Sequence, residues 1–441
     1  MKNNILKMAK SFILLLCLLQ FNASTKVQDI YFPPLIGNNW ETISPTSLNW
    51  CDDDIEALYD FLEVEQTKSF ILLKDGKIVL EQYFGDFGQD SLWIWYSAGK
   101  SLRATLVGIA QAEGLVNIED SSADYLGQGW SSLSPEKEAL ITIRHQLTMT
   151  SGLDETEFSC ITPNCLTYVA DAGTRWAYHN GSYNLLKPIL EKVSGQTLNQ
   201  YTNTRIRNTI GMWSGFWLDV GNNSFFVSRA RDMARFGLLI ANQGVWKETT
   251  ILKDSAFYDQ MVNTSQNLNP SYGYLWWLNG KEGYIPPGST DFIEGPIAPD
   301  APSDVFLAAG SQGQFIGISP DNGWVMIRQG NYTTNSLAAL DLHNQIWKRI
   351  MSLECMPTAI EETSMNSIQV FPNPSKDVLH IQLPFNSTDT IVRLYDLNGN
   401  NILETTANEK NYTLNVSYLN GIYFLEVVSG EMFWVEKVMM E

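Results

Sequence analysis

The sequence predicts a chain of two parts, a large domain that mixes helices with strands and a small all-β module after it. Its 441 residues exceed the usual size of a single domain. Hydrophobic residues make up 44% of the chain and charged residues only 17%, so a substantial core can form. Helical spacing of apolar residues after Ser97 and short β-branched runs after residue 366 predict the two kinds of structure.

The charge balance limits the partners. The chain has 29 basic and 48 acidic residues, a net charge of −19. This charge repels nucleic acid and anionic lipid, so we expect neither as a partner.

Residues 1–24 are typical of a signal peptide. Lysines precede an apolar run over 12–19, and Asn22-Ala23-Ser24 supplies small residues for cleavage. The run is shorter than the roughly 20 residues of a spanning helix. The alternative is an uncleaved N-terminal anchor. Without another long apolar stretch, we expect an exported mature chain without a transmembrane span.

Export changes the interpretation of the cysteines. Four remain after cleavage, an even number in a compartment where disulfides persist, and they allow three pairings. Cys160 and Cys165 suit a local bridge within a loop, and Cys51 and Cys355 would then join the two ends of the main domain, residues 25–355. Metal binding is the competing interpretation, but neither the cysteines nor the four histidines have ligand spacing, so we expect no metal. No cofactor motif is present either.

The main domain contains a nucleophile motif. Apolar residues at helical spacing follow Ser97, and Gly114 supplies a stop, so Ser97 should begin a helix. In Ser97-Ala98-Gly99-Lys100 the serine and lysine stand at i and i+3, which puts both on one helical face. A second copy, Ser134-Pro135-Glu136-Lys137, lies in a polar segment, and we interpret it as a chance occurrence.

Two further stretches accompany this motif. Tyr178-His179-Asn180 is predicted to lie where a loop enters a helix. Residues 308–318 form a predicted glycine-rich strand in which the backbone can approach a ligand, and a strand over 324–328 follows. The histidines His145 and His179 beside these motifs are expected to be structural.

In this order and spacing, the motifs resemble the serine β-lactamase and penicillin-binding-protein superfamily, most closely the class C-like branch with esterases and 6-aminohexanoate-oligomer hydrolases. The resemblance implies an α/β (α+β) fold, an antiparallel sheet flanked by helices plus a helical subdomain. It implies Ser97 as the nucleophile, Lys100 as its partner, Tyr178 as general base and acid, and Asn180 as a hydrogen-bonding group. The backbone N–H groups of Ser97 and of Gln314, just past Gly313, are implied as oxyanion donors.

Physical chemistry supports a role for Tyr178. An ammonium about 4 Å away is worth roughly 4 kcal/mol at an effective dielectric of 20, so a charged Lys100 could lower the pKa of the phenol by about three units. On this argument Tyr178 is partly phenolate at neutral pH.

One departure bears on the substrate. Penicillin-recognising members of the superfamily carry Lys-Thr-Gly where this chain has Ser311-Gln312-Gly313, so a substrate carboxylate would need another cation, such as Arg328. We therefore expect a small-molecule or short oligomeric amide or ester substrate. The alternatives are β-lactamase or D-Ala-D-Ala peptidase activity, and an inactive exported binding protein.

The C-terminal part begins after a polar linker over 356–365. Residues 366–441 contain short β-branched and aromatic runs separated by turns such as Asn398-Gly399-Asn400, which predicts a small β-sandwich. Phe371-Pro372-Asn373-Pro374, Leu419-Asn420-Gly421 and a lysine near the end resemble the C-terminal sorting domain of the type IX secretion system. This resemblance implies that the export machinery is a partner and that the protein is released or attached at the cell surface. A generic adhesive sandwich is the alternative.

Overall fold

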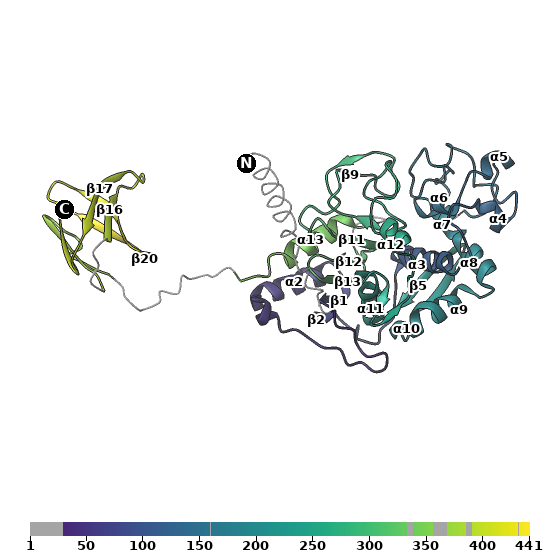
Figure 1. Cartoon of the computed structure of the whole chain (residues 1–441), viewed down its shortest axis with the longest axis horizontal. Coiled ribbons are helices and arrows are strands. Elements are labelled where there is room, and N and C mark those ends of the chain that lie inside the picture. Colours follow the sequence, from purple (N-terminus) through teal and green to yellow (C-terminus); the bar gives the residue numbers. More distant parts are fainter. Residues whose placement is uncertain (1–29, 159, 333–337, 356–367, 385–389, 431) are drawn as a thin grey trace, which may run out of the picture. The chain divides into compact units, whose positions relative to one another are not determined.

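The structure is a computed structural model that describes residues 30–158, 160–332, 338–355, 368–384, 390–430 and 432–441. The predicted signal peptide and linker lie outside these ranges. The chain divides into two compact units, Met1–Cys355 and Met356–Glu441, each with its own hydrophobic core (Figure 1).

An antiparallel sheet of six strands forms the centre of the first unit, in the order β2-β1-β13-β12-β11-β8. Its strands are β1 Thr67–Lys74, β2 Lys77–Tyr83, β8 Trp277–Leu278, β11 Phe306–Gly310, β12 Gln314–Ser319 and β13 Trp324–Gly330. Residues from both ends of the unit therefore meet at β1 and β13.

Helices cover both faces of this sheet. Successive strand residues point to opposite faces, so the helix that each one contacts shows which face that helix covers. A side chain added at Gly237 of α11 (Ala230–Ala241) would meet Val325 and Ile316. One added at the next strand position, Gly317, would instead meet His343, which belongs to α13 (Leu340–Ile350). Figure 1 shows these two helices with the sheet labels between them.

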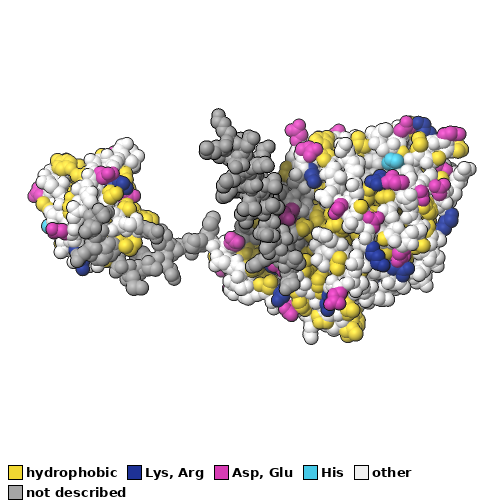
Figure 2. Space-filling view, viewed as in Figure 1, with side chains coloured by type: hydrophobic (Ala, Val, Ile, Leu, Met, Phe, Trp, Pro, Cys, Tyr) yellow, Lys and Arg dark blue, Asp and Glu magenta, His cyan; other side chains and the backbone are white. Residues whose placement is uncertain are grey.

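Further helices and small sheets complete the first unit. The α-helices are α2 Asp52–Val64, α3 Gly99–Ala112, α4 Ser122–Leu126, α5 Pro135–Glu138, α6 Ile143–Leu147, α7 Asn180–Asn184, α8 Leu186–Ser194, α9 Leu198–Thr202, α10 Asn208–Ile210 and α12 Ser255–Met261. The 3₁₀ turns are η1 Pro45–Leu48 and η2 Tyr96–Ala98, and η3 Asn203–Arg207 is a π-helical turn. The small sheets contain β3 Trp93–Ile94, β4 Phe216–Val220 and β5 Asn223–Ser228, then β6 Val245–Trp246 with β7 Thr249–Thr250, and β9 Gly283–Tyr284 with β10 Ile293–Glu294. Charged side chains of both signs are scattered among apolar ones over the visible face (Figure 2).

The glycine-rich segment over 308–318 differs from the prediction. It is not one strand but a hairpin, in which β11 ends at Gly310 and β12 begins at Gln314. Gln312 and Gly313 both adopt positive φ, 64° and 74°, in the turn. The sequence signal was ambiguous because a glycine can mark either a strand interior or a tight turn.

The second unit is the small β-sandwich that the sequence predicts. One sheet has the order β14-β15-β18 and the other β17-β16-β19-β20. The strands are β14 Gln369–Phe371, β15 Val378–Gln382, β16 Thr390–Tyr395, β17 Asn401–Ala407, β18 Asn411–Asn415, β19 Gly421–Ser429 and β20 Met432–Met440. Alternating residues such as Val392, Leu394, Leu425 and Val427 are fully buried between the sheets.

Two disulfides are present in the first unit, Cys51–Cys355 and Cys160–Cys165. These are the pairs that the sequence favours. The former joins the segment before α2 to the segment after α13, and backbone bonds run beside it from Cys51 to Leu353 and from Cys355 to Asn49. Among the described residues, no helix has the length and apolar character to span a bilayer.

Candidate active site

The turn that carries Ser97 is anchored in the core. Ser97 lies in the 3₁₀ turn η2 directly before α3, whose residues from Gly99 to Ala110 are all buried. The N–H group of Trp95 donates to the carbonyl of Phe226 on β5 at 2.8 Å. Tyr96 has a positive φ of 47°, a conformation that costs energy in a non-glycine residue. The tertiary structure therefore holds Ser97 at the start of a buried helix.

Lys100 is hydrogen-bonded to Ser97. Its Nζ lies 3.1 Å from Ser97 Oγ, as the i and i+3 spacing predicts. The Lys100 side chain is 4% exposed, and burial together with the charge of Arg103 holds its pKa well below the usual range. A lysine in these surroundings is able to lose its proton and act as a base.

Arg103 is a second buried cation that sequence reasoning missed. It is fully buried, and its guanidinium donates to Asn184 Oδ1 at 3.4 Å and to the Ser224 carbonyl at 3.2 Å, both uncharged acceptors. The Tyr183 ring lies against both cations, with its centroid 4.3 Å from Lys100 Nζ and 4.3 Å from Arg103 Cζ. Among the described residues, neither cation forms an ion pair with a carboxylate. The i, i+3 spacing of Lys100 and Arg103 was the signal that could have revealed this pair.

Tyr178 lies beside both residues of the nucleophile motif. Its ring centroid is 5.1 Å from Lys100 Nζ, and its other neighbour is the Trp277 ring, stacked at 6.3 Å. A hydrogen bond with Ser97 lowers the pKa of Tyr178, but burial has the larger effect and raises it above the usual value. A phenolate at Tyr178, as expected from the sequence, would need a charged Lys100 beside it. Because both groups are buried, their pKa values move so as to favour a neutral lysine and a neutral phenol.

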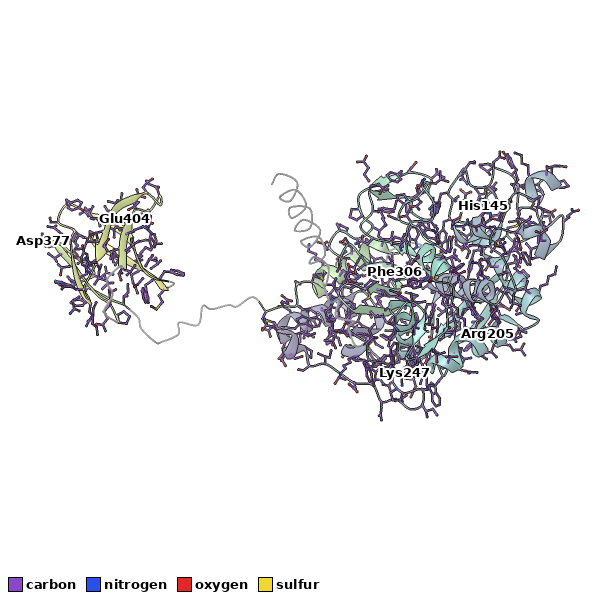
Figure 3. The ribbon with its side chains drawn as sticks, viewed as in Figure 1. His145, Arg205, Lys247, Phe306, Asp377 and Glu404 are labelled. Atoms are coloured by element: carbon purple, nitrogen blue, oxygen red, sulfur yellow. A yellow bond between two sulfur atoms is a disulfide. The ribbon has the colours of Figure 1, made fainter. Side chains whose placement is uncertain are left out.

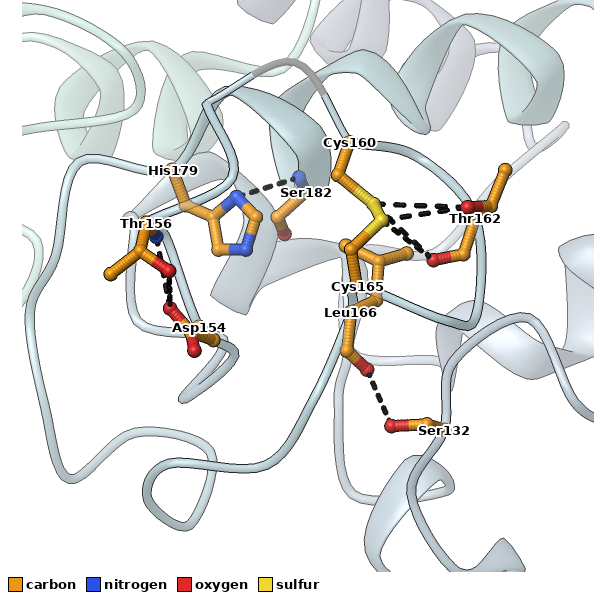
Figure 4. The surroundings of a disulfide bond; sticks show 9 residues. All are labelled: Ser132, Asp154, Thr156, Cys160, Thr162, Cys165, Leu166, His179 and Ser182. Carbon is orange, nitrogen blue, oxygen red and sulfur yellow. Dashed lines mark hydrogen bonds between the residues drawn. A yellow bond between two sulfur atoms is a disulfide. The ribbon is translucent and has the colours of Figure 1, made fainter.

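The next two residues begin the helix that follows this tyrosine. His179 Nδ1 accepts a hydrogen bond from the Ser182 N–H at 3.2 Å and so caps α7 (Figure 4). Burial lowers the pKa of His179 to about 4, so this cap is a neutral imidazole. Asn180 begins α7 and is 5% exposed, and its Oδ1 has no hydrogen-bond partner among the described residues. Asn180 therefore offers an unused acceptor beside Tyr178.

The end of β11 also reaches the nucleophile turn, but through Gly310. A side chain at Gly310 would come within 2.2 Å of the Trp95 carbonyl and 3.0 Å of the Ala98 nitrogen. Only glycine permits this approach.

Gly313 and Gln314 have structural surroundings instead. A side chain added at Gly313 would lie 2.6 Å from the Arg328 guanidinium and 2.8 Å from Leu342. Gln314 is fully buried, and its amide donates to the Gly330 carbonyl at 2.7 Å while accepting from the Gly330 N–H at 3.0 Å. The Gln314 side chain therefore ties the hairpin to β13.

Arg328 is not free to bind a substrate carboxylate. It is fully buried and donates to the carbonyls of Gln312, Gly313, Glu65 and Asn331, each at 2.7–3.1 Å, and to Thr67 Oγ1 at 2.9 Å. Burial lowers its pKa to about 9. All three guanidinium nitrogens are occupied, so the alternative cation suggested by the sequence is a structural residue.

The remaining candidates have structural partners of their own. His145 caps α6, where its Nδ1 accepts from the Thr142 N–H at 3.1 Å, in the helical part of the unit and apart from the strand that carries Phe306 (Figure 3). In the second Ser-x-x-Lys copy, Ser134 precedes the short helix α5, and Lys137 pairs with Asp171. This copy lacks the buried surroundings of the first.

Comparisons with known proteins agree with this architecture. The beta-lactamase family model matches residues 67–345, and the model for the secretion system C-terminal sorting domain matches residues 369–441. No protein with a curated description matches the chain in sequence.

Solved structures of low identity share the fold. A 6-aminohexanoate-dimer hydrolase homologue from Bacillus anthracis has 18% identity and a TM-score of 0.57, over 73% of this chain and 89% of its own. A D-alanine carboxypeptidase from Burkholderia cenocepacia has 17% identity and a TM-score of 0.52, over 68% and 99%. A penicillin-binding protein homologue from Pyrococcus abyssi has 14% identity and a TM-score of 0.50, over 87% and 100%.

The family match covers well over half of the chain, and the sorting-domain match covers the second unit. The sorting domain indicates export to the cell surface or the medium through the type IX system. The chain therefore belongs to the beta-lactamase family, whose members are generally serine hydrolases, and carries a type IX sorting domain at its C-terminus.

Proposed function

We propose that this exported protein cleaves an ester or amide through an acyl-enzyme on Ser97. The observation that carries the proposal is the 3.1 Å hydrogen bond between Ser97 Oγ and Lys100 Nζ. Lys100 is buried, and its pKa lies well below the usual value. A lysine that serves only the fold has no reason to be held in this state beside a serine at a helix start.

The first step is acylation. Neutral Lys100 takes the Ser97 hydroxyl proton while Oγ attacks the substrate carbonyl carbon, which forms a tetrahedral oxyanion. Collapse of this intermediate breaks the bond to the leaving group, whose oxygen or nitrogen receives the proton from Lys100 through the hydroxyl of Tyr178. In the second step water attacks the acyl-enzyme and gives its proton to Lys100 by the same route. Collapse of this second tetrahedral intermediate breaks the bond to Ser97 Oγ, which takes the proton back from Lys100, and the acid is released.

The oxyanion needs N–H donors. One is the Ser97 N–H, at the start of the helix. The predicted second donor, the Gln314 N–H, stays a prediction, and Ser311 is a better candidate because it directly follows Gly310, the residue of β11 that adjoins the nucleophile turn. Within the described part of the chain, β8 pairs with β11 at Phe306 and Leu307 and not at Gly310.

The substrate class follows from the missing cation. Substrates that need their carboxylate bound, such as β-lactams and D-Ala-D-Ala peptides, have no partner in Arg328, whose donors are all used. An ester or amide without an obligatory terminal carboxylate fits this site better. Asn180, with its unused Oδ1, would accept a hydrogen bond from an amide N–H of the substrate.

Active-site labelling tests the proposal. A fluorophosphonate probe should modify the purified chain at Ser97, located by peptide mass spectrometry, and Ser97→Ala should abolish labelling. Turnover of p-nitrophenyl esters, short amide oligomers and nitrocefin should fall at least about a thousandfold in the same variant. Ser134→Ala, in the second Ser-x-x-Lys copy, is the matched control and should behave as wild type. An unlabelled, well-folded wild-type chain would instead indicate an inactive binding protein.

A further inference from the structure

The nucleophile turn rests on the small β3-β5-β4 sheet. Besides the bond from Trp95 to the Phe226 carbonyl, Gly99 packs against β5 so closely that an added side chain would lie 3.4 Å from the Phe226 nitrogen. The surface of this sheet is therefore part of the immediate surroundings of Ser97.

The two faces of the sheet have different neighbours. Trp217 and Phe226 are cross-strand partners, 5% and 0% exposed, and point into the core, where Trp217 lies 4.8 Å from Arg103. The next pair, Leu218 and Phe225, points to the opposite face because side chains alternate along a strand. Leu218 is 43% exposed, so this face is open to solvent.

Tyr96 links this open face to the nucleophile. It directly precedes Ser97, and its ring packs edge-on against Phe225 with centroids 5.7 Å apart. The positive φ of Tyr96 turns the chain so that the neighbouring Trp95 ring packs against Phe226 instead, with centroids 4.9 Å apart. An aromatic surface therefore continues from Ser97 onto the sheet.

We infer that this surface, which we call the apolar shelf, binds the hydrocarbon or aromatic part of the substrate. The shelf consists of Tyr96, Phe225, Leu218 and the exposed residues Phe216 and Val220 on either side along β4. The inference rests on the proposed function and adds a substrate class to it: esters or amides with an uncharged apolar group of several carbons.

Charge argues for this occupant. Asp219 is the only charged residue of β4, and it lies on the opposite face from Leu218 and Val220, where its carboxylate accepts from Lys187 at 2.7 Å. A charged substrate group would have no counter-ion on the shelf and would lose hydration there. A hydrocarbon chain gains from the same contact, by about two- to fourfold in binding for each methylene that is fully buried.

A chain-length series tests the inference. We would measure kcat/KM for p-nitrophenyl acetate, butyrate, hexanoate and octanoate with the full-length mature chain, and expect values that rise with length. Leu218→Asp should lower kcat/KM for octanoate at least about tenfold more than kcat/KM for acetate, so that the rise with chain length is lost. Leu218→Ser serves as a second, milder variant, and melting temperatures check that both fold. Leu140→Asp is the matched control, because Leu140 is 55% exposed and belongs to the segment after α5.

The outcomes separate the two levels of the proposal. If wild type hydrolyses the esters, and folded Leu218→Asp shows the same dependence of kcat/KM on chain length, the inferred role of the shelf is wrong. The proposed serine hydrolase activity would stand. A folded wild-type chain that is neither labelled by the fluorophosphonate probe nor active on any of the esters would overturn the proposed function itself. A dimer in sedimentation that Leu218→Asp dissociates, with no change in length dependence, would identify the shelf as an interface between copies and also overturn the inference.

Discussion

Lys100 and Arg103 are two cationic side chains beside one tyrosine ring, and no carboxylate of the described residues is hydrogen-bonded to either. Each costs free energy to bury in its charged form. Lysine is able to relieve this cost by losing its proton, whereas arginine stays charged, so the pair resolves as a neutral lysine beside a charged arginine. In the proposed mechanism Arg103 would therefore act through Lys100, as a positioning residue.

Replacing this arginine should change the pH dependence of activity. In the proposed mechanism Lys100 acts without its proton, so activity should rise as pH increases through the pKa of Lys100. Arg103→Met removes the positive charge that lowers this pKa, so the acidic limb of the kcat/KM profile should shift to higher pH. Arg103→Lys keeps a charge and should shift the limb less. An unchanged acidic limb in well-folded Arg103→Met would show that Lys100 is not the titrating base.

Tyr178 is predicted to contribute through its hydroxyl and not through a charge. Tyr178→Phe keeps the ring beside Lys100 and Trp277 and removes only the O–H group that would relay the proton in the proposed mechanism. We expect kcat to fall about 10²- to 10⁴-fold with melting temperature nearly unchanged. Activated esters, whose leaving groups need no proton, should lose less than amides, which a comparison of the two substrates would measure. Equal losses would contradict the relay.

At the scale of elements, α7 is held against the loop that the Cys160–Cys165 disulfide closes. A side chain at Gly181 would lie 1.9 Å from the Cys160 carbonyl and 3.0 Å from the His179 ring. His179 also caps α7 (Figure 4). Gly181 therefore packs against both the disulfide loop and the residue that caps its own helix.

Gly181→Ala should therefore disturb the active site without touching a catalytic side chain. The loop or α7 must move, which shifts Asn180 and Tyr178, and a displacement of about 1 Å can cost about a hundredfold in rate. We expect a clear loss of kcat with Ser97 still present, measured on the best ester of the series. Gly88→Ala is the control, since nothing lies within 4 Å of its added side chain. Wild-type kcat in Gly181→Ala would mean that α7 does not position the site.

At the scale of the whole molecule, the candidate active site and the sorting domain lie in different units. Ser97, Lys100 and Tyr178 belong to the first unit, whose ends are joined by Cys51–Cys355, and the second unit buries its own core between two sheets. The family matches divide in the same way, with the hydrolase before residue 346 and the sorting domain after residue 368.

Truncation should separate catalysis from export. A chain that ends at residue 365 keeps every matched catalytic motif, so we expect kcat and KM close to those of the full chain. In the native host the truncated chain should accumulate in the periplasm, since it lacks the type IX signal, which cell fractionation would show. Loss of turnover in a folded truncated chain would mean that the second unit contributes to the active site.

Local sequence patterns predicted several features of this structure. The Ser97–Lys100 pair, the helix after it and the start of α7 at Asn180 depend on spacing over a few residues, which a helix converts directly into contact. The strands and turns of the sorting domain follow from period-2 alternation and turn residues. The cysteine pairs followed from their positions in the chain once export was assumed.

Only the tertiary structure decided the electrostatics of the site and the fate of Arg328. The pKa of Lys100 depends on burial under distant segments, which no local pattern reports. Arg328 looked available in sequence because its acceptors include the carbonyl of Glu65, 263 residues earlier in the chain. Spacing therefore determined which groups meet within an element, whereas the packing of segments far apart in the chain determined which groups keep their charge and which stay free to bind substrate.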